Sequence, residues 1–196
     1  MSGDHGSSLI SAQVRHVEAL LESRGLLDAG EVDTRIDEFL AGGSPANGAR
    51  IVARAWVDPA FAARLLADAN TAIREIGLSM AGGLQEQRLK VVANTAREHN
   101  VVVCTLCSCY PIALLGPSPG WYKSEAYRSR VVRDPRGVLA EFGVELPAGT
   151  SIAVWDASAE SRYMVLPRRP AGIGDLPESE LAGLVTRKGL IGTATV

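Results

Sequence analysis

The sequence lacks a long apolar run and a strong excess of either charge. No stretch reaches the roughly 20 apolar residues that a membrane-spanning helix needs. The polar start, MSGDHGSS, lacks the basic and apolar regions of a secretory signal. These absences predict a cytoplasmic chain that does not bind membranes. The formal net charge is −2, from 20 basic and 22 acidic residues, which argues against a nucleic-acid-binding surface.

Internal repeats and low-complexity tracts are also missing. A length of 196 residues therefore suits one large domain, or one domain with an appended arm. A hydrophobic fraction of 46% is ordinary for a globular chain and supports a sizeable core. The charge is uneven, because residues 1–45 hold eight acidic side chains and three arginines, a net of −5. Either this is a solvated helix face, or the segment is an acidic arm that docks on a partner.

Apolar periodicity divides the chain into a helical half and a mixed half. Helices are predicted at residues 11–27, 31–41, 49–57 and 58–78, with a loop at 42–48 (GGSPANG). Strands are predicted at 89–94, 100–103, 150–156 and 161–167, and further helices at 124–132, 134–143 and 177–186. The simplest partition is a helical, partner-docking arm of residues 1–87 followed by a layered α+β metal-binding domain of residues 88–196.

All three cysteines lie in one short segment, VVVCTLCSCY, residues 101–110. Their odd number and the reducing compartment argue against a disulfide framework. Cys104, Cys107 and Cys109 cannot share one face of a helix or strand. They can converge if the chain curls into a tight loop, and converging thiolates repel unless a cation neutralises them. The spacing therefore predicts a metal site.

The common metal sites are each one ligand short here. A structural zinc site needs four ligands, and the nearest histidine is His99, across the valine run from Cys104. An iron–sulfur cluster lacks its fourth cysteine, and one catalytic thiol does not explain three cysteines. Spacing alone leaves the metal open, and a structural zinc or redox-sensing module stays an alternative.

Longer stretches carry a more specific signal. The segment CTLCSCYP, with LLGPSPGWYKSEAYRSRVVRDPRGVLAEFGVELP and VWDASAESRYMVLPRRPAG after it, resembles the α subunit of nitrile hydratase. The resemblance covers about residues 83–192 and extends more weakly through the helical arm. Thr105, between the first two cysteines, resembles the cobalt-type branch, since the iron-type branch usually has serine there. The related γ subunit of thiocyanate hydrolase shares the cysteine turn and is the alternative.

The resemblance implies a particular metal site. Its ligands would be the sulfurs of Cys104, Cys107 and Cys109 and the backbone nitrogens of Ser108 and Cys109, with a sixth position open. Because a backbone amide gives up its proton only to a strongly Lewis-acidic ion, the implied metal is low-spin Co(III), with Fe(III) as the alternative. Cys107 would be oxidised to a sulfinate and Cys109 to a sulfenate. Two arginines of a β-type subunit would donate hydrogen bonds to the added oxygens.

The implied activity is hydration of an organic nitrile to its amide. It would require a β-type partner, made of one chain or two smaller ones, and an activator protein that delivers the metal. Either the metal acts as Lewis acid on the nitrile or it activates water. The implied catalytic residues are Cys109, as nucleophile or base, with Cys107, Ser108 and Gln85.

Two features near the cysteines are open to more than one interpretation. Asp156 and Arg162 match a supporting polar network of the family, although a structural salt bridge at a strand end is favoured over a direct catalytic role for them. After the cysteines, the family commonly has P-W-P-V-L-G, whereas this chain has PIALLG, with Ile112 in place of the tryptophan and Ala113 in place of the second proline. Either the substrate pocket is reshaped for a bulky or heterocyclic nitrile, or a β-type subunit compensates for the exchange.

Overall fold

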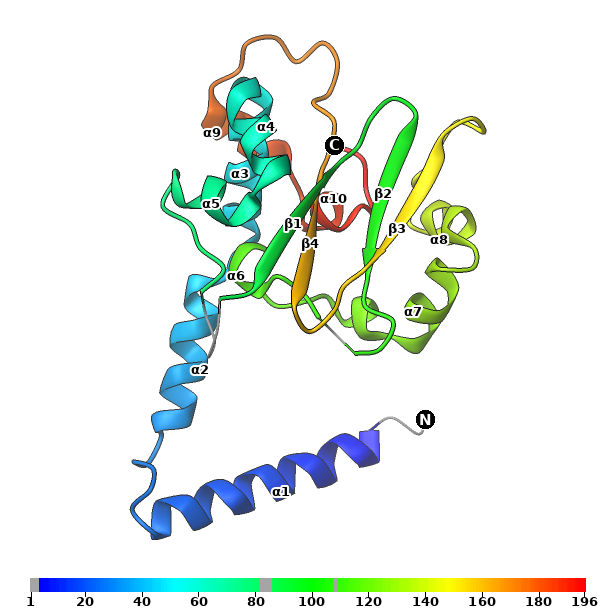
Figure 1. The fold of residues 1–196 in the computed structure, drawn as a ribbon. Helices are drawn as coiled ribbons and strands as arrows, with labels where there is room; N and C mark the ends of the chain where they lie inside the picture. Colours follow the sequence, from blue (N-terminus) through cyan, green and yellow to red (C-terminus); the bar gives the residue numbers. More distant parts are fainter. Residues whose placement is uncertain (1–3, 82–85, 108) are drawn as a thin grey trace. The chain divides into compact units, whose positions relative to one another are not determined.

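Two helices form the first part of the chain in the computed structural model, which describes residues 4–81, 86–107 and 109–196 (Figure 1). They are α1, Asp4–Ser23, and α2, Glu31–Gly42, and both were predicted, although α1 starts earlier and ends sooner than expected. Residues Met1–Phe39 form a unit of their own. On α1, Leu9, Ile10 and Val14 are each more than half exposed, so this unit leaves its apolar stripe uncovered.

The second unit, Leu40–Val196, contains all the remaining elements. The boundary between units thus follows Phe39, whereas the sequence placed one at residue 87. Helices α3 (Pro45–Val57), α4 (Pro59–Ala67) and α5 (Ala69–Arg74) belong to this unit because their apolar faces pack on its strands and on its C-terminal helices. Ile51, Phe61 and Ile73, one from each helix, are at most 1% exposed. The docking role of the N-terminal arm stays a prediction.

Capping side chains move two of the predicted helix boundaries. The loop expected at residues 42–48 is shorter, residues 43–44, because α2 extends to Gly42 and Pro45 starts α3, where the Ser44 hydroxyl accepts a hydrogen bond from the Ala46 N–H. The helix predicted at 58–78 is divided, because Asp68 ends α4 and caps α5 through the Thr71 N–H. Asp58 caps α4, as expected.

Four strands form two parallel pairs. Strand β1 (Arg88–Ala93) pairs with β4 (Ser161–Leu166), and β2 (Glu98–Val103) pairs with β3 (Ser151–Asp156). All four were predicted. The β2–β3 register sets Asp156 opposite Val103, the residue before Cys104. The end of β3 therefore lies beside the start of the cysteine segment.

Helices lie on both outer sides of these strands (Figure 1). Helices α4 and α5 contact β1, and α8 (Pro135–Glu141) contacts β3 and the adjoining α7 (Glu125–Val131). The other elements are α6 (Ile112–Leu115), a 3-10 turn (Gly120–Lys123), α9 (Glu178–Leu184) and α10 (Arg187–Ile191). Of these, only α9 had been predicted. The arrangement confirms the predicted α+β class.

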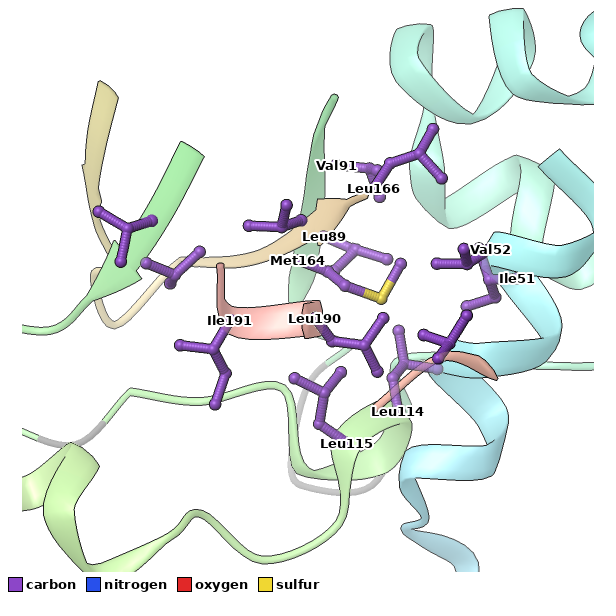
Figure 2. Close-up of a cluster of buried hydrophobic side chains, with 14 of the residues drawn as sticks. Ile51, Val52, Leu89, Val91, Leu114, Leu115, Met164, Leu166, Leu190 and Ile191 are labelled. Carbon is purple, nitrogen blue, oxygen red and sulfur yellow. The ribbon is translucent and has the colours of Figure 1, made fainter. Parts of the chain in front are cut away.

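The core joins the helical and stranded parts of the second unit (Figure 2). Its side chains converge from five elements: Ile51 and Val52 (α3), Leu89 and Val91 (β1), Leu114 and Leu115 (α6), Met164 and Leu166 (β4), and Leu190 and Ile191 (α10). Helix α6 follows the cysteine segment directly. The segment is therefore anchored at one end by β2 and at the other by two fully buried leucines.

His99 is buried on β2 and takes no part in the cysteine cluster. Its Nε2 lies 2.7 Å from the carbonyl oxygen of Gly192, so this nitrogen carries the proton and donates. Its Nδ1 lies 3.3 Å from the side-chain nitrogen of Asn94. The side-chain oxygen of Asn94 accepts a hydrogen bond from the Asn100 N–H, which fixes the orientation of that amide, so its nitrogen donates to Nδ1. Both ring nitrogens are engaged. Burial lowers the pKa of His99, and the hydrogen bond to Gly192 opposes that shift only in part.

The lowered pKa of His99 predicts a loss of stability in acid. The pKa of His99 is lower in the folded chain than in the unfolded chain. As the pH falls below about 6.5, the unfolded chain therefore binds a proton at this residue before the folded chain does. The free energy of unfolding should then fall by at most about 1.4 kcal/mol per pH unit from this group. Urea unfolding between pH 7.5 and pH 5 measures it. In His99→Gln this part of the pH dependence should vanish, and parallel curves would contradict it.

Candidate metal centre

Three cysteine sulfurs converge where β2 ends. The Sγ atoms of Cys104 and Cys107 are 3.3 Å apart, those of Cys107 and Cys109 are 3.1 Å apart, and all three lie within 4.8 Å of one another. Cys104 is buried, Cys109 is half-buried and Cys107 is exposed. The tight loop inferred from the spacing is present, and one side of the cluster faces outward.

The sulfur spacing indicates what kind of ion the cluster fits. With metal–sulfur bonds of about 2.3 Å, two ligands at a tetrahedral angle lie about 3.8 Å apart, and two at a right angle about 3.3 Å apart. The observed separations of 3.3 and 3.1 Å match the right angle. Within the described residues, no other histidine, cysteine or carboxylate joins the group. The donors thus suit an ion with more than four ligands better than a tetrahedral zinc.

The Cys109 thiol holds its proton when no cation is bound. Burial, followed by the hydrogen bond with Cys107, raises the pKa of the Cys109 thiol to about 12, and the positive charge of Arg162 opposes the shift. Three sulfurs so close together cannot all be thiolates without a compensating positive charge. A metal ion would supply that charge.

Asp156 holds the beginning of the loop. Its carboxylate accepts one hydrogen bond from the Thr105 N–H, at 2.9 Å, and another from the Thr105 hydroxyl, at 2.5 Å. The salt bridge between Asp156 and Arg162 is not among the ion pairs of the described residues; Arg162 is 8% exposed and donates to the carbonyl of Ser158. Asp156 therefore acts on the cysteine loop, and the simple strand-end ion pair is wrong.

Buried tyrosines support the loop from behind. The Tyr122 hydroxyl donates to the carbonyl of Cys109 at 3.0 Å, and the Tyr127 hydroxyl donates to that of Val102 at 2.7 Å. Burial raises the pKa of both hydroxyls, so they keep the protons that they donate. Trp121 and Phe142 pack against Tyr127 at ring distances of 4.9 and 6.1 Å. This packed aromatic cluster therefore holds the two hydroxyls in place against the backbone at both ends of the loop.

Arg128, on α7, reaches the loop from another side. One guanidinium nitrogen lies 3.2 Å from the carbonyl oxygen of Cys107 and 3.4 Å from that of Thr105. The sequence did not single this residue out, because Arg128, Arg130 and Arg133 look alike in the helical run. Two predicted site residues, Ser108 and Gln85, lie outside the described residues.

Comparison with known proteins identifies the family. The family model described as nitrile hydratase, alpha chain, matches residues 8–194. The chain belongs to this nitrile hydratase α-chain family. The low-molecular weight cobalt-containing nitrile hydratase subunit alpha of Rhodococcus rhodochrous is 52% identical over 185 residues, covering 94% of this chain and 88% of the relative. The resemblance inferred from the cysteine segment is confirmed.

Two further similar proteins differ from the Rhodococcus relative in the substrate or the metal that their names give. The thiocyanate hydrolase subunit gamma of Thiobacillus thioparus is 44% identical over 158 residues, covering 76% of this chain and 65% of the relative. The crystal structure of a double mutant of Fe-type nitrile hydratase from Comamonas testosteroni Ni1 has a TM-score of 0.87 at 39% identity, covering 96% of this chain and 90% of that one. The nitrile hydratase α-chain fold is thus similar in proteins with different metals and substrates.

Ile112, where the family resemblance led us to expect a tryptophan, lies close to the cysteines. Ile112 starts α6, three residues after Cys109, and is partly buried against the core. Leu106, inside the loop, is 92% exposed, the highest value among the exposed large apolar side chains of the described residues. The cysteine loop therefore has a buried inner side, at Cys104, and an exposed outer side that carries the apolar Leu106.

No helix in the described part of the chain is both long enough and apolar enough to cross a membrane.

Proposed function

We propose that this chain is the metal-bearing subunit of a cobalt nitrile hydratase, which adds water to an organic nitrile and releases the amide. The observation that carries the proposal is the convergence of three cysteine sulfurs in a member of the nitrile hydratase α-chain family. The cobalt-containing Rhodococcus relative supports the choice of metal. Thr105, which takes the place of the serine usual in the iron branch, supports it too.

Cys104, Cys107 and Cys109 would hold the cobalt through sulfur, and Ser108 and Cys109 through backbone nitrogen. We propose Co(III), with Fe(III) as the alternative, because three converging sulfurs, right-angle separations from Cys107 to the other two, and no fourth side-chain donor among the described residues fit a six-coordinate ion. When bound, this ion supplies Lewis acidity for the addition of water to the nitrile. Cys107 would carry a sulfinate and Cys109 a sulfenate.

The protein's own groups would hold the loop in shape for this reaction. Asp156 fixes Thr105, Tyr122 fixes the carbonyl of Cys109, and the burial of Cys104 excludes water from the inner side. The exposed side, at Cys107, is where substrate would approach. We propose that Cys109 acts there as nucleophile or base, with Cys107, Ser108 and Gln85 assisting through hydrogen bonds.

A β-type partner would cover that exposed side. Among the described residues, Leu106 is 92% exposed beside the sulfurs, and burial of this apolar side chain by another chain would be favourable. The N-terminal unit offers a second contact, with its uncovered apolar stripe and the net charge of −5 over residues 1–45. We propose that both dock on the partner, made of one chain or two, that an activator protein loads the metal, and that the complex is cytoplasmic, where free thiols persist.

The decisive experiment uses the complex co-expressed with its β-type partner in cobalt medium. Metal analysis should give about one cobalt per chain, as one metal site predicts, and mass spectrometry of the peptide containing Cys104–Cys109 should show the oxygens on Cys107 and Cys109. Turnover of organic nitriles but not of thiocyanate is expected. One zinc with three unmodified thiols would refute the enzyme, and turnover of thiocyanate alone would favour the γ-type alternative, which the Thiobacillus relative keeps open.

The exchange at Ile112 predicts a substrate preference. If Ile112 leaves room for a bulky nitrile, Ile112→Trp should lower kcat/KM for a heterocyclic nitrile relative to a small aliphatic one by about 10-fold or more, since the loss of a few methylene volumes changes discrimination by that amount. Steady-state kinetics on both substrates measures the ratio. Ile112→Leu, of similar volume, is the matched control. The same ratio in wild type and Ile112→Trp would show that the pocket is shaped elsewhere.

A further inference from the structure

Arg128 contacts the cysteine loop at two carbonyl groups and has a counterpart on the same helix that does not. Its guanidinium donates to the carbonyl oxygens of Cys107, at 3.2 Å, and Thr105, at 3.4 Å. Arg130, two residues further along α7, pairs with Glu141 at 2.6 Å. Arg128 forms no ion pair with any carboxylate in the described residues. Its charge is thus directed at the backbone of the loop.

The position of Arg128 is fixed by its neighbours. Ser124 caps α7 through the Tyr127 N–H, and the Tyr127 side chain is 5% exposed with its hydroxyl bonded to the Val102 carbonyl on β2. The residue before Arg128 therefore ties α7 to the strand that leads into the loop. Arg128 itself is half-buried, and its Nε has no hydrogen-bond partner among the described residues. The hydrogen bonds of its terminal nitrogen to the two carbonyls therefore hold its charge at the loop.

We propose that Arg128 is a positioning residue of the metal site, whose guanidinium holds the Thr105 and Cys107 carbonyls and so keeps the cysteine loop in its converging shape. This inference rests on the proposed function, since the loop is a metal site only if that proposal holds. The Asp156 carboxylate accepts a hydrogen bond from the Thr105 N–H, and Arg128 donates one to the Thr105 carbonyl, so Thr105 is held on both sides. The first half of the loop then cannot unwind without losing a charged hydrogen bond.

The second contact has an electronic consequence. The Cys107 carbonyl belongs to the same peptide group as the nitrogen of Ser108, one of the proposed ligands. Peptide resonance shares charge between that nitrogen and that oxygen. A guanidinium on the oxygen therefore stabilises the electron-rich peptide group that a metal–nitrogen bond requires. Outer contacts of this kind tune a metal as well as orient its ligands.

The test compares Arg128→Met with Arg130→Met in the complex with the β-type partner. Arg128→Met should weaken cobalt binding about 10- to 100-fold, as is usual when a group behind a ligand is lost, and should shift the sulfur-to-cobalt absorption band. Arg128→Lys, which keeps the charge, should restore the band in part. Arg130→Met should match wild type in both readouts. Wild-type cobalt affinity and an unshifted band in Arg128→Met would overturn the proposal.

A measurement without metal separates this proposal from the proposed function. In the metal-free complex, hydrogen–deuterium exchange at residues 105–107 should be faster in Arg128→Met than in wild type and unchanged in Arg130→Met. If the wild-type complex takes up no cobalt, the proposed function fails, and the exchange rates alone decide whether Arg128 holds the loop. If Arg128→Met does not assemble, Arg128→Leu, which also lacks a donor, is measured by the same criteria. Wild-type exchange in it would overturn the proposal.

Discussion

Replacing Cys104 by serine is expected to remove cobalt from the assembled complex and to abolish nitrile hydration. Cys104 is the sulfur nearest the core, 1% exposed, and its Sγ also accepts the Cys107 N–H at 3.3 Å. Serine nearly preserves the shape but offers a hydroxyl that holds its proton far more tightly than a thiol does. Loss of a direct ligand should cost more than the roughly 100-fold in affinity that the loss of an outer contact can cost. Metal analysis and the turnover rate measure both effects.

The control for Cys104→Ser lies inside the same loop. Leu106→Ala changes a side chain that carries no donor atom and that points away from the sulfurs' buried side, 92% exposed on this chain, so cobalt content per assembled complex should stay at the wild-type value even where the partner covers it. The apparent melting temperature of Cys104→Ser without metal should be close to that of the metal-free wild type, because a near-isosteric exchange leaves little cavity. Cobalt retained in Cys104→Ser, or lost equally in Leu106→Ala, would remove Cys104 from the ligand set.

The metal centre illustrates which part of a site a sequence can reveal. Cys104, Cys107 and Cys109 lie within six residues, so local chain geometry alone brings them together. The residues that hold them come from far along the chain. Asp156 arrives only through the parallel pairing of β2 with β3, and Arg128 only because the Tyr127 hydroxyl ties α7 to the Val102 carbonyl on β2. No periodicity or spacing encodes such a contact.

The same distinction explains the fold. Strands with runs of valine, such as Val101–Val103, were predicted because their local preference and their burial agree. The helix boundaries at Pro45 and Asp68 were missed although Ser44 and Asp68 are recognised capping residues, because a loop-like composition outweighed the cap at one and an apolar stripe ran across the other. The sequence groups helices α3 to α5 with α1 because they carry the same apolar pattern, and only the strands and C-terminal helices that α3 to α5 contact distinguish them.

Gly192, at the end of α10, packs against β2, the strand that leads into the metal centre. It ends α10 with a φ of 89°, a backbone region that L residues adopt only with strain. A Cβ at this position would lie 1.9 Å from the carbonyl oxygen of Asn100 and 2.9 Å from the Cα of Val101. Both are backbone atoms in the middle of β2, so neither can move aside without displacing the strand. The Gly192 carbonyl also receives the hydrogen bond from His99.

Gly192→Ala should therefore cause a loss of stability well beyond that of an ordinary glycine exchange. The left-handed conformation costs about 1–2 kcal/mol for alanine, and forcing a methyl group into a packed interior adds about 1–3 kcal/mol. We expect a total near 3 kcal/mol, which lowers Tm by roughly 6–12 °C in a domain of this size. Gly143→Ala is the matched control, because its φ is 82° and no atom lies within 4 Å of its Cβ position. It carries only the conformational cost, so the difference between the two variants isolates the contact with β2. Equal losses in both would show that α10 can retreat from the strand, and the close approach at Asn100 would then have no part in holding β2.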